Sequence, residues 1–194
     1  MPEPTYPLRT ERLDLRPYGS GDLDHLRAMY TREDVVRYLY WGPMDEDQLR
    51  ESLAKKVRRR ALGDEGDGLN VLGVERESGE VVGEALLFWA SREHRTAEIA
   101  FVVQPGFQGR GYATEMGAEM LRLAFDVCGL HRVIGQCDAR NAASAAVLER
   151  LGMRREAYQV ENEYVKGEWC SELDYALLAD EWAAARLAAR TVRP

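Results

Sequence analysis

Long apolar runs are absent from this 194-residue sequence, and no stretch reaches the roughly 18 apolar residues that a membrane-spanning helix needs. The first ten residues are polar and rich in proline, so they lack the apolar core of a signal peptide. Cysteine is scarce, and Cys128, Cys137 and Cys170 form neither a CxxC metal motif nor a disulfide framework. These absences predict a reduced, cytoplasmic protein without a membrane partner.

A surplus of basic residues is also missing. The chain has 26 lysines and arginines against 33 aspartates and glutamates, a net charge of −7, which argues against a general nucleic-acid binder. The three histidines, His25, His94 and His131, are isolated and lack the spacing of metal ligands. We therefore expect no nucleic-acid partner and no metal site.

The apolar pattern predicts one α+β domain. Its periodicity switches between alternation, typical of strands, and helical spacing. Strands are expected over 10–18, 69–76, 81–89, 97–104, 131–138, 153–164 and 168–178, and helical segments over 23–39, 45–62, 112–128, 142–151 and from 180 onward. Consecutive strands in the middle of the chain exclude a doubly wound parallel sheet. We expect an N-terminal tail over 1–9, a single domain over 10–182, and a C-terminal helix or tail over 183–194.

The stretch from Glu98 to Cys128 organises the rest of the chain. It predicts a strand, a turn with three glycines and an amphipathic helix, and a helix N-terminus after such a turn suits a phosphate-bearing ligand. A P-loop would need Lys and then Ser or Thr after its last glycine, but Tyr112 and Ala113 follow Gly111. A dinucleotide fingerprint, GxGxxG, that starts at Gly109 would need its last glycine at position 114, which is Thr114.

Residues 108–113, Gln-Gly-Arg-Gly-Tyr-Ala, fit a pattern that resembles the acetyl-CoA pyrophosphate loop of the GCN5-related N-acetyltransferases (GNAT). Further motifs resemble the RimJ/RimL branch of that superfamily, the ribosomal-protein N-terminal acetyltransferases. They are Thr10 to Pro17, Gly111 to Glu115, Asn141 to Ser144, Leu151 to Met153 and Tyr175 to Leu178. The resemblance spans nearly the whole chain, from Thr10 to about Trp182.

This resemblance implies the GNAT fold, a mixed and mostly antiparallel sheet of six to seven strands flanked by helices, with a splay between the two central strands. It implies acetyl-CoA as co-substrate and a primary amine, either a peptide N-terminus or a small molecule, as acceptor. The family's contacts to acetyl-CoA correspond here to the backbone of Phe101, Val102 and Val103, to the loop Gln108, Gly109, Arg110, Gly111, Tyr112, Ala113 and Thr114, and to Asn141 and Ser144. Relatives often form homodimers, so a homodimer is one state that the resemblance suggests.

The resemblance also implies three catalytic residues. Glu98 matches the general base of histone-acetylating relatives, and Glu163 matches a proposed base of RimL-like enzymes, with Glu161 a weaker candidate beside it. The tyrosine that usually donates a proton to the leaving thiolate is replaced by Leu148, which has no proton to give. In the RimL-like branch a serine takes this role, and the matching residue is Ser144.

Several alternatives remain open at the level of sequence. Glu98, Glu163 or a chain of waters could take the proton of the amine. The acceptor could instead be an aminoglycoside, a polyamine or an amino-acid derivative. The chain could also be a non-catalytic acyl-CoA-binding protein with the same fold, or a nucleotide-binding module. We expect direct attack of the amine on the thioester in a complex with both substrates bound.

Overall fold

The computed structural model of the protein describes residues 4–191. A single eight-stranded sheet runs in the order β1-β2-β3-β4-β5-β6-β8-β7. The elements are β1 (Leu8–Arg9), β2 (Leu13–Pro17), α1 (Leu23–Tyr30), α2 (Glu33–Val36), α3 (Glu46–Arg58), β3 (Gly68–Glu75), β4 (Val81–Ser91), β5 (Thr96–Val103), α4 (Tyr112–Arg122), β6 (Arg132–Asp138), α5 (Ala142–Arg150), β7 (Arg154–Val165), β8 (Glu168–Leu178) and α6 (Ala179–Thr191).

The predicted fold class is confirmed, since helices flank a mixed sheet whose named strands are antiparallel neighbours except for β5 and β6. Seven strands lie where the alternating pattern predicts them. The eighth is β1, whose Leu8 pairs with Leu15 of β2 and is buried. Two residues are too short a run for alternation to identify, so the sequence pattern left this strand in the expected tail.

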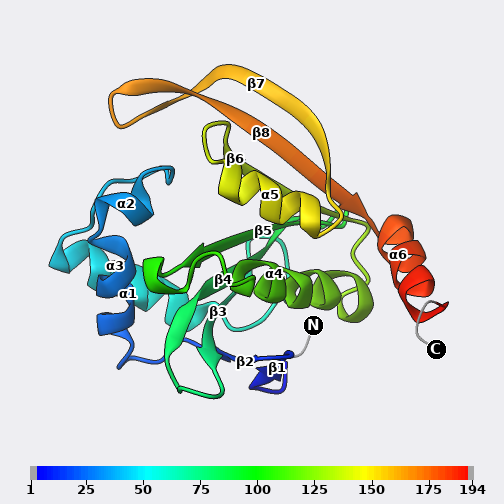
Figure 1. Ribbon diagram of the computed structural model, residues 1–194, viewed down its shortest axis with the longest axis horizontal. Helices are drawn as coiled ribbons and strands as arrows, with labels where there is room; N and C mark the ends of the chain where they lie inside the picture. The colour runs from blue at the N-terminus through cyan, green and yellow to red at the C-terminus, as the bar shows by residue number, and fades with distance from the viewer. Residues whose placement is uncertain (1–3, 192–194) are drawn as a thin grey trace.

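Helices cover both faces of the sheet (Figure 1). On one face, α4 packs against β4 and β5 over the larger core. On the other face, α1, α2 and α3 enclose a second core. Its fully buried members include Leu26 and Met29 of α1 and Leu72 of β3. The β7–β8 hairpin arches over the top of the sheet toward α2.

The central strands part from one another, as expected. β5 and β6 are parallel and pair over three positions, the last of which joins Glu98 to Ile134. Beyond this point β5 stays paired with β4 as far as Val103, while β6 stays paired with β8 as far as Asp138. The sheet is therefore forked beyond Glu98, with a gap between the second halves of β5 and β6.

Helix starts agree with the sequence in part. Asp45 caps α3 in a capping box with Gln48, each side chain bonding the other's backbone N–H at 2.9 Å. Asp22 precedes α1 but does not cap it, because its carboxylate binds Arg16 at 2.7 Å and the N–H of Gly19. The last helix, expected from 180 onward, begins at Ala179, so that Asp180 lies within its first turn.

The two end segments expected from the sequence are described only in part. The C-terminal helix α6 is anchored by Trp182, whose Nε1 donates to Asp126 at 2.8 Å and whose ring lies against Phe125. Residues 1–3 and 192–194 of the two expected end segments lie outside the described residues. Among the described helices, none has the length and apolar character needed to cross a membrane.

Candidate active site

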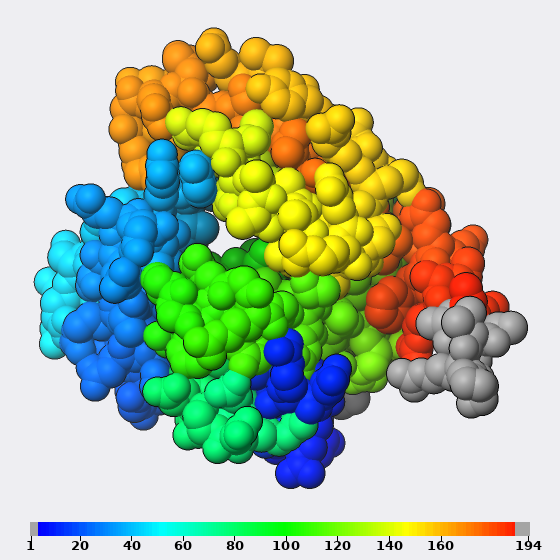
Figure 2. Space-filling view, viewed as in Figure 1, coloured from blue at the N-terminus to red at the C-terminus, as the bar shows by residue number. Residues whose placement is uncertain are grey.

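A pocket of about 270 Å³ fills the fork between β5 and β6. Its walls come from the segment after α2, the start of α5 and the β7–β8 hairpin, and we call it the reaction pocket. Figure 2 shows the corresponding hollow between the blue segment near residue 40, the green loop before α4 and the yellow start of α5. Glu98, Ser144 and Glu163, the three predicted catalytic residues, all line it.

The backbone of β5 has free hydrogen-bonding groups along the fork. In an antiparallel pair the residues alternate between bonding the neighbour and facing away. Trp89 of β4 bonds Asp67 on the β3 side, so its neighbour Phe88 bonds Glu98 across the β4–β5 pair. By the same alternation Val102 faces β4, whereas Phe101 and Val103 direct their backbone groups into the gap. Two of the three predicted backbone contacts thus face the gap, where an extended ligand can bond them, although the oxygen of Val103 already accepts from the Gln108 amide.

The glycine loop turns sharply before α4. Gly109 and Gly111 have φ angles of 74° and 83°, a left-handed conformation that side chains with a Cβ avoid. Gly111 immediately precedes α4 and no side chain caps the helix, so the first N–H groups of α4 point outward. This arrangement provides backbone donors and a positive helix end for phosphates.

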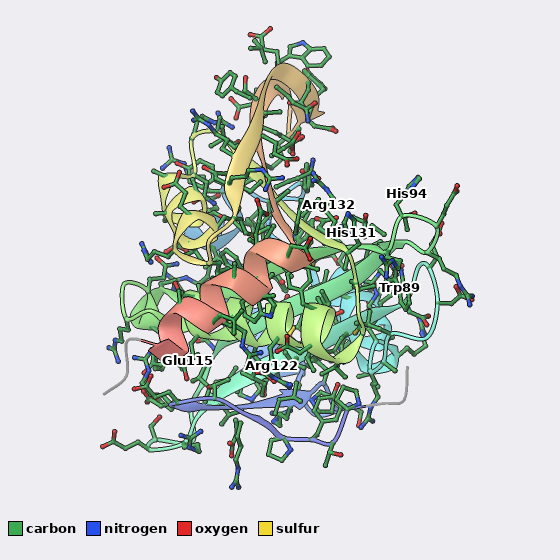
Figure 3. The ribbon with its side chains drawn as sticks, turned by 90° about the vertical axis from the view of Figure 1, so that its right-hand side faces the viewer. Trp89, His94, Glu115, Arg122, His131 and Arg132 are labelled. Atoms are coloured by element: carbon green, nitrogen blue, oxygen red, sulfur yellow. The ribbon has the colours of Figure 1, made fainter. Side chains whose placement is uncertain are left out.

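Arg12, the residue before β2, braces the glycine loop from outside. Its guanidinium donates to the backbone oxygen of Arg110 at 2.9 Å, pairs with Glu115 at 2.8 Å and lies over the ring of Tyr112. Figure 3 shows Glu115 on α4 near the first strands of the chain. The bracing pre-forms the loop, so that less conformational entropy is lost when a ligand binds there.

The side chains of two predicted loop residues, Gln108 and Tyr112, make contacts within the protein. The Gln108 amide donates to the backbone oxygen of Val103 at 3.2 Å and closes the turn. The Tyr112 ring is buried and its hydroxyl donates to Glu75. Their backbone N–H groups remain near the helix start, as do those of Ala113 and Thr114.

Asn141 caps α5, as the sequence predicts. Its Oδ1 accepts the N–H of Ser144 at 3.1 Å, which leaves the Ser144 hydroxyl outside the cap. That hydroxyl lies within hydrogen-bonding reach of the Cys137 thiol on β6. Burial raises the pKa of Cys137 to about 11, so the group is a neutral thiol at pH 7.

Four carboxylates line the reaction pocket, and one of them, Asp138, is paired with Arg140. Within the described residues, neither Glu98 nor Glu163 has a cationic partner, and Glu172 of β8 is held only by neutral donors. Burial and, to a smaller extent, the charge of Glu172 raise the pKa of Glu98 above its usual value. A carboxyl group with such a pKa accepts a proton more readily than an exposed glutamate does.

Sequence reasoning missed Glu172 and its partners. Glu172 is 5% exposed and accepts hydrogen bonds from the Tyr40 hydroxyl and, at 2.5 Å, from the Asn162 amide. Burial and this contact raise the pKa of Tyr40, so it stays a neutral donor. An acid within the predicted strand 168–178 was the only signal, and nothing in the local pattern separates it from the exposed Glu168.

A lysine in its turn helps to hold the hairpin down over the pocket. Lys166, in the turn between β7 and β8, donates to the backbone oxygens of Val36 at 2.9 Å and Arg37 at 2.7 Å. Arg140 supports the same wall through Asp138 at 2.6 Å and Glu168 at 2.9 Å. The pocket is therefore closed by contacts between distant parts of the chain.

The histidines lie away from the reaction pocket. Figure 3 shows His94 and His131 at the edge where β5 and β6 begin, the end opposite to the fork. Over residues 4–191, no three or more His, Cys, Asp and Glu side chains are grouped so as to hold a metal ion.

Comparison with known proteins identifies the family. Residues 12–154 match the acetyltransferase (GNAT) domain family. The chain belongs to this family, and it is an acetyl-CoA-dependent N-acetyltransferase.

Relatives in sequence carry several acceptor names. The protein named "Uncharacterized N-acetyltransferase YnaD" from Bacillus subtilis is 29% identical over 90% of this chain and 98% of its own length. "Putative ribosomal N-acetyltransferase YdaF" from the same organism is 29% identical over 89% and 94%. A spermidine N(1)-acetyltransferase from Vibrio cholerae is 24% identical over 81% and 88%.

Solved structures agree in fold. A GNAT-family acetyltransferase from Bacillus anthracis superposes with a TM-score of 0.78 at 29% identity, covering 89% of this chain and 98% of its own. The Vibrio cholerae spermidine N-acetyltransferase in complex with CoA and spermine superposes with a TM-score of 0.76 at 21% identity, covering 89% and 98%. At 21% identity, the similarity to this second structure supports only a shared fold.

Proposed function

We propose that the protein moves the acetyl group of acetyl-CoA to a primary amine by direct attack, with both substrates bound at once. The observation that carries this proposal is the fork beyond Glu98, where free backbone groups of β5 lie beside three carboxylates that lack a cationic partner. The backbone groups suit an extended thioester arm, and the carboxylates suit an ammonium group that must lose a proton.

The residues at the fork fit acetyl-CoA. Phe101 and Val103 would bond the pantetheine arm as a neighbouring strand does, and the N–H groups from Gly109 to Thr114 would hold the pyrophosphate. The side chain of Arg110 lies over the ring of Phe107 at the edge of the loop, where it can reach a phosphate. The bound co-substrate supplies the activated acetyl group.

Two proton transfers accompany the acetyl transfer, and we assign them to side chains of the reaction pocket. Glu98 takes the proton that the amine loses as the C–N bond forms, directly or through Glu163 and water. The Ser144 hydroxyl donates to the sulfur as the C–S bond breaks. A backbone N–H of β5 that faces the gap stabilises the negative charge that develops on the carbonyl oxygen.

Direct attack is favoured over an acetylated cysteine. Cys137 and Cys170 both line the reaction pocket, so thiols are present near the reacting atoms. The pKa of Cys137, raised to about 11, keeps it protonated, and a thiol is a far weaker nucleophile than a thiolate. The carboxylates instead favour an amine as the nucleophile.

We assign the chain to the RimJ/RimL-like branch within the family. The motifs from Thr10 to Leu178 support this assignment, and so does the similarity to YdaF at 29% identity. The acceptor is then a peptide N-terminal amine or a small-molecule amine. A polyamine is the second candidate, because relatives at 22–24% identity carry spermidine acetyltransferase names.

We also propose a cytoplasmic homodimer. The three free cysteines suit a reducing compartment. The hairpin exposes four large apolar side chains, a feature of surfaces that pair with another protein: Tyr158, Val160, Tyr164 and Trp169. Light scattering over a range of concentrations tests the dimer, and a mass of one chain throughout contradicts it.

An acceptor screen with thiol detection tests the activity. The purified protein, acetyl-CoA and a panel of amines, including peptides with a free N-terminal alanine or serine, should release free CoA only when an amine is present. Thermal stabilisation by acetyl-CoA should be measured in parallel. Stabilisation without thiol release from any amine would favour a non-catalytic acyl-CoA-binding protein.

A further inference from the structure

A second pocket continues from the reaction pocket along the α3 face of the sheet. It has a volume of about 440 Å³ and lies between α3, β4, β5 and the segment after α2, and we call it the α3 pocket. The two pockets share five wall residues: Leu39, Trp41, Leu86, Ala100 and Phe101. A molecule whose amine lies at Glu98 can therefore place its other end in the α3 pocket.

One face of α3 gives this pocket a polar wall. The lining residues recur at helical spacing: Gln48, Glu51, Ser52, Lys55, Lys56 and Arg59. The end of α3 is rich in cations, with Lys55, Lys56 and Arg58 in its last turn and Arg59 just after it. Three of these four residues line the α3 pocket, so this basic helix end does not face the solvent alone. The polar wall indicates a ligand with a charged or hydrogen-bonding end.

Most of the charges in this wall are already paired. Lys56 binds Glu84 of β4 at 2.6 Å, with side-chain exposures of 13% and 6%. Lys55 pairs with Glu51 at 2.7 Å near the solvent. These two pairs cancel, so the cation that remains is Arg59.

Packing contacts, rather than an ion pair with a carboxylate, hold Arg59 in place. Its guanidinium lies over the ring of Phe88 at 5.7 Å, and its stem lies against Gly68, where a Cβ would come within 3.1 Å of the Arg59 Cδ. Gly68 and Phe88 are cross-strand partners. Within residues 4–191 no carboxylate pairs with Arg59. A cation fixed by packing, rather than by an ion pair, is pre-organised to receive an anion.

A buried amide lies in the same pocket. Asn70 of β3 is 1% exposed, and its Oδ1 finds no hydrogen-bond donor among the described residues. Buried amide oxygens are rarely left without a donor. A ligand that fills the α3 pocket and brings an N–H or O–H group would satisfy it.

The two charged sites lie on one row of the sheet. Gly68, which the Arg59 stem contacts, pairs with Phe88, and Phe88 pairs with Glu98. The backbones of Gly68 and Glu98 therefore lie two strand spacings apart, about 10 Å, and the Arg59 guanidinium lies over Phe88 between them. This backbone separation sets the upper scale of a ligand that reaches from Glu98 to Arg59.

We propose that the acceptor is a primary amine that carries a carboxylate about 10 Å away, with the amine beside Glu98 and the carboxylate on Arg59. This inference rests on the proposed function for the position of the amine. A polyamine would instead bring a second cation to Arg59, which repels it. The carboxylate can belong to an ω-amino acid or to a short peptide with a free C-terminus.

Matched acceptors test the inference. Aminooctanoate, diaminooctane and octylamine share one chain length, and trialanine can be compared with its C-terminal amide. We expect kcat/KM for each carboxylate to exceed that of its matched partners by roughly tenfold to a hundredfold, the range of one charge-assisted hydrogen bond. Arg59→Met should remove this preference, mainly by raising KM for the carboxylates. The unbranched methionine side chain keeps the packing on Gly68.

A binding measurement separates the two proposals. Calorimetry with CoA present compares acetamidooctanoate with N-octylacetamide, and Arg58→Met serves as the control because Arg58 is exposed and lies outside the α3 pocket. Tighter binding of the carboxylate that Arg59→Met abolishes and Arg58→Met keeps supports the inference, even if no amine is acetylated. Equal binding of both compounds, or faster acetylation of diaminooctane, overturns it while leaving acetyl transfer intact.

Discussion

Glu98 of β5 faces Ile134 of β6 at the last position where these parallel strands are paired. One residue further on the strands part, so the carboxylate lies at the base of the fork. Its side chain shares a face of the sheet with Leu86 and Ala100, which line both pockets. The proposed base therefore stands where the two substrates would meet.

Glu98→Gln should remove the acidic limb of the pH–rate profile. Burial and Glu172 raise the pKa of Glu98, so kcat/KM of the unmodified enzyme should rise with pH through that raised value. Without the carboxylate, we expect the plateau to fall by roughly a hundredfold. Initial rates from pH about 5 to 9 measure this. A retained limb at full rate would assign the base to Glu163 or water.

The same pKa shift affects stability. A glutamate whose pKa is raised in the folded state contributes stability below its unfolded pKa, and this contribution is lost as the pH rises through the folded value. Glu98→Gln should therefore match the parent at acidic pH and become the more stable of the two toward neutral pH. In a matched variant, Glu172→Gln, the loss of the Glu172 charge should lower the pKa of Glu98. The acidic limb of the pH–rate profile should then move to lower pH. Urea unfolding at several pH values measures the stability difference, and no pH dependence would contradict it.

Gly111→Val should abolish acetyl-CoA binding. Gly111 has φ of 83°, which costs a residue with a Cβ roughly 1–2 kcal/mol, and a Cβ there would lie 3.5 Å from the Arg12 guanidinium that braces the loop, so a valine should displace both the brace and the loop backbone. Isothermal titration with acetyl-CoA measures the loss. Gly106→Ala is the control, because a Cβ there meets no atom within 4 Å. Unchanged affinity of Gly111→Val would refute the loop assignment.

Ser144→Ala should lower turnover more than affinity. The cap of α5 uses the backbone N–H of Ser144, so removing the hydroxyl leaves the helix start intact. We expect kcat to fall by about tenfold or more with little change in the Kd of acetyl-CoA. Steady-state kinetics beside titration separates the two quantities, and the exposed Ser20→Ala should change neither. An unaltered kcat would exclude Ser144 from proton transfer.

Lys56→Met should destabilise the fold by about 3 kcal/mol, because it leaves the buried Glu84 without its cation. The Tyr18 and Tyr30 hydroxyls also donate to Glu84, and they remain as its neutral partners. Lys55→Met changes an exposed pair one residue away and should cost less than about 1 kcal/mol. Urea unfolding at neutral pH compares the two. Equal costs would mean that the buried pair adds nothing.

The sequence predicts those parts of the fold that local pattern determines. Seven strands follow from alternation, and the Asn141 cap follows from its position before a helix. The fork does not follow from local pattern, because it depends on how far β5 and β6 stay in register. It could be expected only from the resemblance of the glycine loop to a known family.

Contacts between distant residues were beyond local reasoning. Tyr40 and Glu172 are 132 positions apart, and neither has a neighbour that marks it. Arg59 appeared as part of a basic helix end, and its place over Phe88 follows only from the packing of α3 on the sheet. Sequence reasoning therefore located the glycine turn and the Asn141 cap, but not the contacts that hold Glu172 and Arg59 in place.

The Lys166 contact bears on how this enzyme could change over time. Lys166 binds the backbone oxygens of Val36 and Arg37, and every residue type presents the same oxygen. The Lys166 contact therefore does not depend on the identity of the side chains that follow α2. Mutations in that short segment, Tyr40 with its bond to Glu172 excepted, can reshape the wall facing the amine without breaking the Lys166 contact. The wall can therefore vary at those positions without a compensating change at Lys166.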